Sequence, residues 1–389
     1  MPPHIPLLFD GRAWADGRAP ALLEHLRASG TVIRVPDDES WAVLGYAEAV
    51  EVLTHPQTYS SAWGTGVRSK HDGGPAPEFL SLNLSDPPRH TALRRGVAHA
   101  FNPSRLSALM GGLRQRTKEA VRSLHDQGGD FVTEAAQPLA LGTFGEWLSV
   151  EGSELQWLGD VSRRLARAEE LHPGQHAQAY EEWRSADEEL QSLLRDGWHQ
   201  GRSGAFWELA RNVRMDGAPL EERDAIYLLR LIVQTGHETT AHVLSGALHA
   251  LLTHEVDLAS LDELAAVEEL LRWTAPIIRF GRRVTHSAVL GGVELPPGAR
   301  VIVFFPAANR DPARFLDPNR LWLERRPNPH LTFGAGPHTC LGAALARMHL
   351  RALMEALREG PRLRLAGEAQ RLVSAVTSGF TSLPVAGRR

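Results

Sequence analysis

The sequence predicts a mainly α-helical fold with a minor β-sheet region, built as a single domain over residues 1–389. Helical patterns dominate residues 103–253, where short glycine-containing segments such as Gly128-Gly129 separate one helix from the next. Strand patterns are short and lie mainly in the first 50 residues and in residues 284–300. No internal repeat or low-complexity linker marks a boundary between domains.

The first 80 residues alternate between short helices and short strands. A helix, two strands around a polar turn, a second helix and a long glycine- and proline-rich loop are expected, in that order. Their residues are 21–28, 31–35, 41–44, 47–53 and 64–77, respectively. Long loops inside compact domains often have a function, so the last segment is of interest.

The second half of the chain is expected to contain two long helices around an irregular region. Residues 222–254 are predicted to form one long helix, because an apolar run at 225–233 lies within a continuous helical pattern. After the strands of residues 284–300 come a proline-rich stretch without periodicity and a glycine-rich loop. A final amphipathic helix is expected at about residues 341–357.

The composition excludes several classes of protein. Apolar residues make up 43% of the chain and charged residues 23%, which is typical of a packed globular protein. Cys340 is the single cysteine, so an internal disulfide, a zinc ribbon and a four-thiolate iron–sulfur cluster are excluded. The net charge of −4 argues against nucleic acid as a partner. Because the start lacks a signal-peptide pattern and no run approaches the ~20 apolar residues of a membrane span, a cytoplasmic protein is expected.

Residues 333–342 place Cys340 in a glycine-rich loop directly before the last predicted helix. The segment reads Phe-Gly-Ala-Gly-Pro-His-Thr-Cys-Leu-Gly. The unpaired N–H groups and positive dipole end of a helix N-terminus favour a thiolate, and glycine lets the backbone approach a flat group closely. A thiolate placed there is either a nucleophile or a metal ligand.

This segment matches the pattern F-G-x-G-x-H-x-C-x-G at every fixed position and resembles the cysteine loop of the cytochromes P450. The resemblance extends over about residues 41–385. It implies the P450 fold, with Cys340 as the thiolate axial ligand of a haem b iron. It also implies haem contacts from the other fixed positions of the loop, which are Phe333, Gly334, Gly336, His338 and Gly342.

A second motif of the family is the E-x-x-R of residues 269–272, which places Glu269 and Arg272 one turn apart on a helix. Taken alone, the pattern also fits an ordinary surface ion pair. In the family it is a buried charge pair with a structural role, completed by an arginine from the irregular segment before the cysteine loop. The resemblance assigns that place to Arg320.

Residues 235–240, Thr-Gly-His-Glu-Thr-Thr, resemble the family's oxygen-activation segment. The resemblance implies that Thr239 donates a hydrogen bond to oxygen and that Glu238 links it to a proton supply. A threonine hydroxyl bonded to the carbonyl of Thr235 would open the oxygen groove. Without Cys340, the same pair would be interpreted as a solvated helix face. Thr235 departs from the family's usual small residue and is expected to crowd the groove or contact the substrate.

Basic residues are expected at the haem propionates. Residues 86–95 resemble the family's segment with a histidine and an arginine one helical turn apart, here His90 and Arg94. Arg282 matches the next propionate arginine, and its neighbour Arg283 is the alternative. Surface salt bridges are the other interpretation of these residues.

The resemblance implies a haem-thiolate monooxygenase that inserts one oxygen atom from O2 into a hydrophobic small organic molecule. The sequence shows no flavin or ferredoxin module, so a separate ferredoxin or flavodoxin-type donor with its reductase is expected. A peroxide-driven haem-thiolate enzyme and a non-catalytic haem-thiolate sensor of gases or ligands are the alternatives. Family position implies a mostly apolar substrate cavity, lined by Ile232, Thr235, Ile277, Ile278, Phe280 and Phe380.

Overall fold

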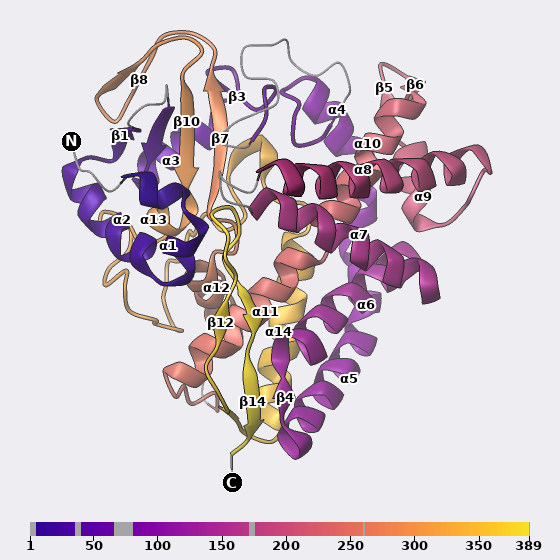
Figure 1. Ribbon diagram of the computed structural model, residues 1–389, viewed down its shortest axis with the longest axis vertical. Coiled ribbons are helices and arrows are strands. Elements are labelled where there is room, and N and C mark those ends of the chain that lie inside the picture. The colour runs from indigo at the N-terminus through magenta and orange to yellow at the C-terminus, as the bar shows by residue number, and fades with distance from the viewer. Residues whose placement is uncertain (1–4, 36–39, 66–80, 171–175, 260, 389) are drawn as a thin grey trace.

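A β-rich part lies beside a larger helical part in the computed structural model (Figure 1). The structure describes residues 5–35, 40–65, 81–170, 176–259 and 261–388, so the expected loop at 64–77 lies almost entirely outside the described residues. Within them, the mainly α-helical fold with small sheets is confirmed.

The described helices differ widely in length, and most of the long ones lie after residue 100. They are η1 (Ile5–Phe9), α1 (Gly11–Ala15), α2 (Arg18–Ser29), α3 (Tyr46–Thr54), α4 (Arg89–Val97), η2 (Ala98–Phe101), α5 (Pro103–Gln127), the π-helical turn η3 (Val132–Ala136), α6 (Gln137–Leu148), α7 (Gly152–Glu170), α8 (His176–His199), α9 (Ala205–Arg211), α10 (Glu222–Thr235), α11 (Glu238–Thr253), α12 (Glu263–Thr274), α13 (Phe305–Ala308), η4 (Gly336–His338) and α14 (Ala343–Glu359).

The described strands are short. They are β1 (Val32–Arg34), β2 (Ser40–Val43), β3 (Tyr59–Ser60), β4 (Gly129–Asp130), β5 (Arg214–Met215), β6 (Ala218–Pro219), β7 (Arg279–Val284), β8 (Ala288–Leu290), β9 (Val293–Leu295), β10 (Arg300–Phe304), β11 (Leu363–Leu365), β12 (Gln370–Arg371), β13 (Phe380–Ser382) and β14 (Pro384–Gly387).

The main sheet has the strand order β1-β2-β10-β7-β3, and its central strand β10 is buried along its whole length. β10 runs parallel to β2 and antiparallel to β7, with Val301 opposite Arg282 and Val303 opposite Phe280. Val301 and Val303 pack into one hydrophobic cluster, whereas Ile302 packs into another that contains residues of η1 and α2. Because side chains alternate along a strand, the sheet is covered on both faces, and Arg282 lies on the Val301 face.

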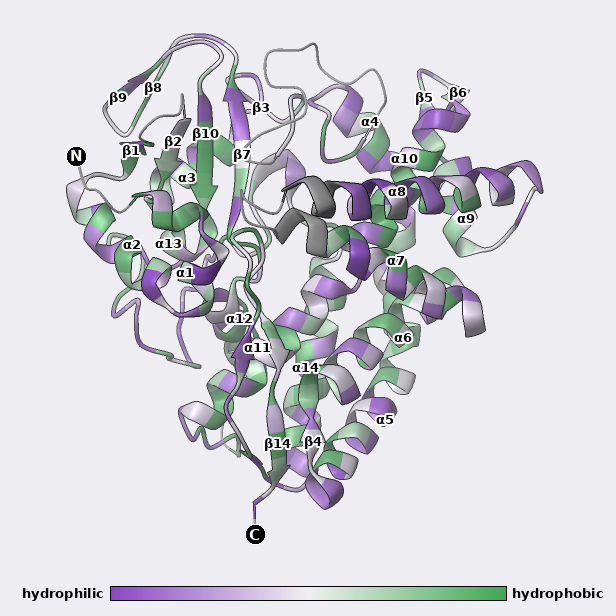
Figure 2. Cartoon of the chain, in the orientation of Figure 1, coloured by the Kyte–Doolittle hydropathy of each residue, from purple (hydrophilic) through white to green (hydrophobic). Residues whose placement is uncertain are grey.

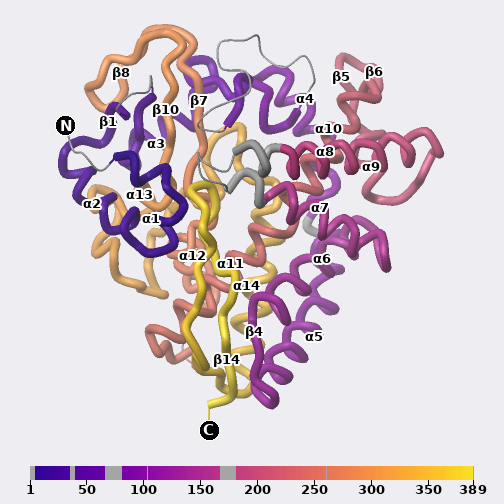
Figure 3. Tube along the Cα trace, in the orientation of Figure 1, coloured from indigo at the N-terminus to yellow at the C-terminus, as the bar shows by residue number. Residues whose placement is uncertain are grey.

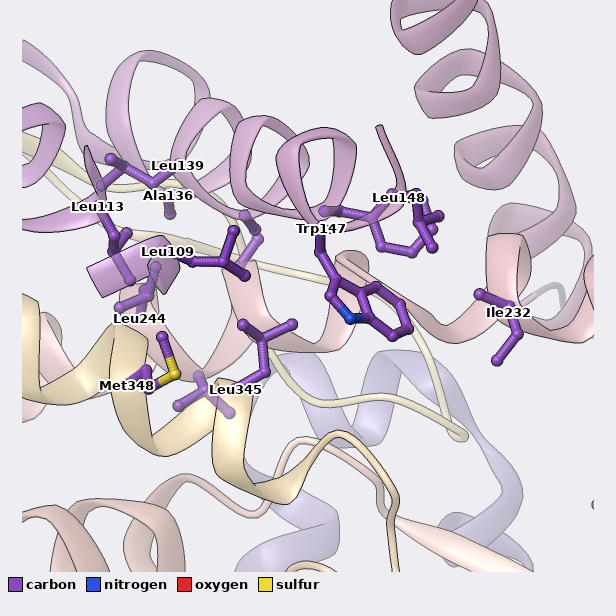
Figure 4. Packing of buried hydrophobic residues seen from close by; sticks show 14 of the residues in the cluster. Leu109, Leu113, Ala136, Leu139, Trp147, Leu148, Ile232, Leu244, Leu345 and Met348 are labelled. Carbon is purple, nitrogen blue, oxygen red and sulfur yellow. The ribbon is translucent and has the colours of Figure 1, made fainter. Parts of the chain in front are cut away.

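The helical part surrounds α11 and α14, which pack against each other. Figure 4 shows Leu345 and Met348 of α14 beside Leu244 of α11. Colouring by hydropathy shows that β10 is mainly hydrophobic below its first residues, whereas α8 is mostly purple and white (Figure 2). The C-terminal strand β14 joins β11 to β4 and runs along α5 (Figure 3).

The predicted long helix at residues 222–254 is wrong, because the chain breaks between α10 and α11 at Gly236 and His237. Two side-chain hydroxyls donate hydrogen bonds to backbone carbonyls near the break. Thr235 Oγ1 donates to the carbonyl of Leu231 over 2.8 Å, and Ser162 Oγ donates to the carbonyl of Val233 over 3.1 Å. Of these two carbonyls, that of Val233 lies in the last turn of α10, where the interrupted helix leaves carbonyls without their usual partners.

None of the described helices is both long and apolar enough to cross a membrane.

Candidate active site

A cavity of about 300 Å³ lies where the start of α11, the loop before α14 and the strand β7 come together. Four segments that are far apart in the sequence supply most of its wall, and most of the lining side chains are apolar. These segments are residues 82–101, 231–243, 276–282 and 332–346.

The cysteine loop is held by a backbone hydrogen bond and by glycine. The N–H of Cys340 donates to the carbonyl of Phe333 over 2.9 Å, and α14 begins three residues later. Gly334 and Gly336 have φ angles of +71° and +68°, which residues with a Cβ rarely adopt. A Cβ at Gly336 would lie 2.5 Å from the carbonyl oxygen of Leu53, so the loop and the end of α3 approach each other closely.

The thiol of Cys340 faces the cavity and is accessible there. Burial raises its pKa, while the N–H groups of Gly342 and Ala343 and the charges of Arg94 and Arg347 act in the opposite direction. Burial therefore outweighs the helix N-terminus that the sequence analysis invoked. A positively charged group inside the cavity would favour the thiolate form.

Four basic side chains, His90, Arg94, Arg282 and His338, line another part of the cavity. The rings of His90 and His338 lie 4.0 Å apart between centroids, and burial together with neighbouring arginines lowers their pKa values to about 4 and about 3. Burial also lowers the pKa of Arg282 to about 10. Neither ring nitrogen of His90 has a hydrogen-bond partner, although the residue is 1% exposed. Such a cluster fits an anionic ligand with several acceptor oxygens.

The cluster also settles which of two neighbouring arginines faces the cavity. Arg282 lines the cavity wall, whereas the guanidinium of Arg283 lies over the ring of Trp63 at 5.1 Å and is not part of that wall.

Thr239 lines the same cavity as Cys340, but its neighbour Glu238 does not. The Glu238 side chain is 12% exposed, and its Oε1 lies 3.7 Å from Nδ1 of the buried His237. Burial lowers the pKa of His237 to about 4, with Arg163 adding to the effect. In this segment, the hydroxyl of Thr235 donates a hydrogen bond to the backbone carbonyl of Leu231. The sequence predicts a different bond, from the hydroxyl of Thr239 to the carbonyl of Thr235.

Comparison with known proteins decides the family. A family model described as Cytochrome P450 matches residues 257–359. The chain is 30% identical to a steroid C26-monooxygenase of Mycolicibacterium smegmatis over 93% of this chain and 90% of that protein. It is 31% identical to the cytochrome P450 monooxygenase PikC of Streptomyces venezuelae over 100% of this chain and 95% of that protein.

The chain belongs to the cytochrome P450 family.

A solved structure has the same fold. Cytochrome P450 CYP268A2 of Mycobacterium marinum, in complex with pseudoionone, superposes with a TM-score of 0.84 at 27% identity and 97% coverage of both chains. As a P450 monooxygenase, the chain is an oxidoreductase, and its family uses a haem with a thiolate ligand.

The residues of this P450 cavity fit a haem. The unpaired nitrogens of His90 and the surrounding basic groups match the two carboxylates of the macrocycle, and the metal would supply a positive charge that favours the thiolate form of Cys340. Phe333, Gly334 and Gly342 also line the cavity. Gly336 does not line it and instead meets the backbone of Leu53 and Thr54.

The buried charge pair of the P450 contains a different third residue from the one expected. Glu269 and Arg272 are 0% exposed, and Arg272 Nε donates to Glu269 Oε2 over 2.7 Å. Arg325 Nε, from the irregular segment, donates to the same oxygen over 3.0 Å. The assignment of Arg320 is wrong, because its side chain is exposed and only its carbonyl contributes, as an acceptor from Arg272 and Arg325.

The predicted substrate-lining residues divide into two groups. Ile232, Thr235, Ile277 and Phe280 line the cavity, whereas Ile278 and Phe380 do not. Ile278 packs into the cluster on the far side of the sheet, and the ring of Phe380 lies 4.6 Å from that of His249. The prediction failed because it did not fix which face of each strand meets the cavity.

Sequence reasoning missed several lining residues, including Leu82, Asn83, Phe101 and Trp147. Leu82 and Asn83 directly precede the segment that contains His90 and Arg94. That closeness was the one available signal.

Proposed function

We propose that the chain inserts one atom of O2 into an apolar small organic molecule, with haem b bound through Cys340. The observation that carries this proposal is a single, mostly apolar cavity lined by both Cys340 and Thr239. When bound, the haem supplies an iron centre at which O2 is reduced and activated. The proposal treats residues 1–389 as one P450 domain.

The basic cluster would hold the haem carboxylates through two kinds of donor. Burial lowers the pKa values of His90 and His338, so the two rings would act chiefly as N–H donors rather than as added positive charges. Arg94 and Arg282 supply the positive charge. This division limits repulsion between four basic groups in a small space.

Thr239 and Glu238 would deliver protons to bound oxygen. Thr239 lines the cavity, and its hydroxyl would donate to oxygen and accept a replacement proton. Glu238 lies outside the lining and next to His237, so it would pass protons toward the threonine from behind the cavity wall.

An apolar substrate is supported by Ile232, Ile277 and Phe280 in the wall. Two similar proteins are consistent with an apolar substrate. One is a steroid C26-monooxygenase, and one solved structure is a complex with pseudoionone. Electrons would come from a separate ferredoxin or flavodoxin-type protein with its reductase.

The first test of this proposal is the absorption spectrum of the haem-loaded protein. The reduced protein with carbon monoxide should show an absorption band at ~450 nm, because a thiolate ligand produces it. Cys340→Ser should lose this band. A wild-type pigment without the band would contradict the proposed ligand.

Turnover distinguishes the alternatives. With a ferredoxin system, Thr239→Ala should keep the band near ~450 nm but release more hydrogen peroxide per NADH oxidised, since the proton donor to oxygen is lost. Turnover with hydrogen peroxide but never with a reductase would favour the peroxide-driven enzyme. Gas binding with no product from any substrate would favour the sensor.

A further inference from the structure

A short turn in the wall of the cavity holds Asn83 in a fixed orientation. The N–H of Leu84 donates to the carbonyl of Ser81 over 3.1 Å, which closes a four-residue turn with Leu82 and Asn83 at its centre. Ser81 is 5% exposed and also donates its hydroxyl proton to Asn83 Oδ1 over 2.5 Å. Both central residues of the turn line the cavity.

The hydrogen bond from Ser81 decides which atoms of Asn83 remain available. An asparagine amide has one acceptor oxygen and an NH2 group with two donors. A separation of 2.5 Å is typical of an O–H···O bond and is too short for an N–H···O bond, so the oxygen meets Ser81. The Nδ2 group has no hydrogen-bond partner among the described residues, and Asn83 itself lines the cavity.

Three other polar side chains of the wall differ from Asn83 in this respect. Thr235, Thr332 and Thr339 each donate their hydroxyl proton to a backbone carbonyl over 2.7–2.8 Å. Four basic side chains already face the place proposed for the haem carboxylates. Asn83 is therefore a donor that neither the protein nor the carboxylates require, in a wall that is otherwise mostly apolar.

We propose that Asn83 selects substrates that carry a hydrogen-bond-accepting oxygen, such as that of a ketone, ester or alcohol, on an apolar skeleton. The inference rests on the proposed function, because it takes the substrate to bind in the haem cavity. A pure hydrocarbon would leave both N–H groups unpaired after it displaced water from them, whereas an acceptor oxygen would replace that water. Ser81 is the positioning residue that keeps the donors directed away from itself.

The test uses ligands that are anchored at the iron, so that binding does not depend on the unknown substrate. Two series of 1-substituted imidazoles of rising chain length carry either a plain alkyl tail or the same tail with one ketone. Dissociation constants of the haem-loaded protein are measured from the Soret shift. At one or two chain lengths, the ketone should bind about tenfold more tightly than the alkyl compound, which is the effect of one good hydrogen bond.

Three variants locate the effect. Asn83→Leu should abolish the ketone preference, and Ser81→Ala should reduce it, because the amide can then rotate. Leu82→Met is the matched control in the same turn and should keep the preference. Absence of a ketone preference at every chain length, its persistence in Asn83→Leu, or an equal loss for both series would overturn the inference.

The outcomes separate this inference from the proposed function. A wild-type protein with neither the band at ~450 nm nor an azole shift would overturn the proposed function and this inference with it. A protein that shows both, yet binds both series alike, would overturn the role of Asn83 alone.

Discussion

Glu269 is a fully buried carboxylate that accepts hydrogen bonds from several residues. It is 0% exposed and accepts from Arg272, Arg325, Asn328 and the N–H of Trp322. A buried charge is tolerated only when it is paired and its lone pairs are satisfied, so each donor offsets part of the cost of removing the carboxylate from water. The group ties α12 to the irregular segment that leads into the cysteine loop.

Removing one of the side chains that donate to Glu269 should therefore lower the stability of the fold. Arg325→Ala should lower the free energy of unfolding by about 3–5 kcal/mol, because it leaves part of a buried charge uncompensated. Arg320→Ala is the matched control and should change it by no more than about 0.5 kcal/mol, since that side chain is exposed. Urea denaturation of the two variants measures both values, and equal losses would contradict the assignment.

The confusion between these two arginines shows what a sequence can specify. The cysteine loop could be read directly, because its chemistry lies in ten consecutive residues. Arg320, Arg325 and Arg326 lie within seven residues of a segment that has no periodicity, so no pattern tells which one points inward. That choice depends on how the segment folds against α12.

At the scale of elements, the break between α10 and α11 depends on close packing at Gly236. A Cβ there would overlap the ring of Phe144 and lie 2.7 Å from the carbonyl oxygen of Ile232. The backbone at Gly236 has an ordinary helical conformation, with φ of −77°, so steric contact rather than backbone freedom demands glycine. The sequence did not reveal the break, because a single glycine within a helical pattern does not by itself end a helix.

Substitution of this glycine should be destabilising. Gly236→Ala should lower the unfolding free energy by about 1–3 kcal/mol through overpacking. Gly111→Ala, in the helix α5 with nothing within 4 Å of the added Cβ, should instead raise it by about 1 kcal/mol. Thermal unfolding of both variants makes the comparison, and destabilisation by both would argue against the contact with Phe144 as the cause.

Glu268 links α12 to α14 and to the segment between them. It accepts two hydrogen bonds from Arg347, over 2.7 and 2.8 Å, and lies 3.1 Å from Nε2 of His330. Burial alone would raise its pKa, but the bonds from Arg347 and His330 lower it overall, from 4.5 to about 2. A carboxyl whose pKa is lower in the folded state stabilises the fold above pH 4.5, and this contribution is lost as the pH falls toward 2.

Glu268→Gln should therefore be less stable than the wild type at pH 7, and the difference should shrink between pH 4.5 and about 2. Melting temperatures measured across this range test the sign. Glu294→Gln, at an exposed position in β9, is the control and should show a small and pH-independent effect. A gap between wild type and Glu268→Gln that widens on acidification would contradict the assignment.

At the scale of the whole molecule, the cavity joins residues as far apart in the sequence as Leu53 and Ala346. A ligand that binds only the folded chain stabilises it by mass action, by about 4 kcal/mol at a thousand times its dissociation constant. Haem loading should therefore raise the melting temperature. It should also slow hydrogen exchange together in residues 82–101, 231–243, 276–282 and 332–346.

The hairpin of β8 and β9 is the internal control for this experiment, since no residue of either strand lines the cavity. Its exchange should not change on haem loading. Protection confined to residues 332–346 would mean that the other three segments do not meet the ligand.

The general architecture was predictable because helical periodicity is a local signal, and the fold class and family are confirmed. The direction in which individual side chains point was harder to predict from the sequence. Ile278 was expected in the cavity, but it lies directly before β7 and packs into the cluster on the other face of the sheet. Strand pairing is a long-range property that no single segment encodes.

The parallel pairing of β2 with β10 has a consequence for synthesis of the chain. The strand β2 (Ser40–Val43) cannot pair with β10 until residues 300–304 have been synthesised. About two thirds of the polypeptide therefore leaves the ribosome before this edge of β2 is covered. Meanwhile β2 presents an unpaired edge of apolar residues, which is a template for association between nascent chains. Non-local strand pairs also form slowly, because a long loop must close first. Early release of the chain before residue 300 should therefore yield aggregates rather than a smaller folded unit.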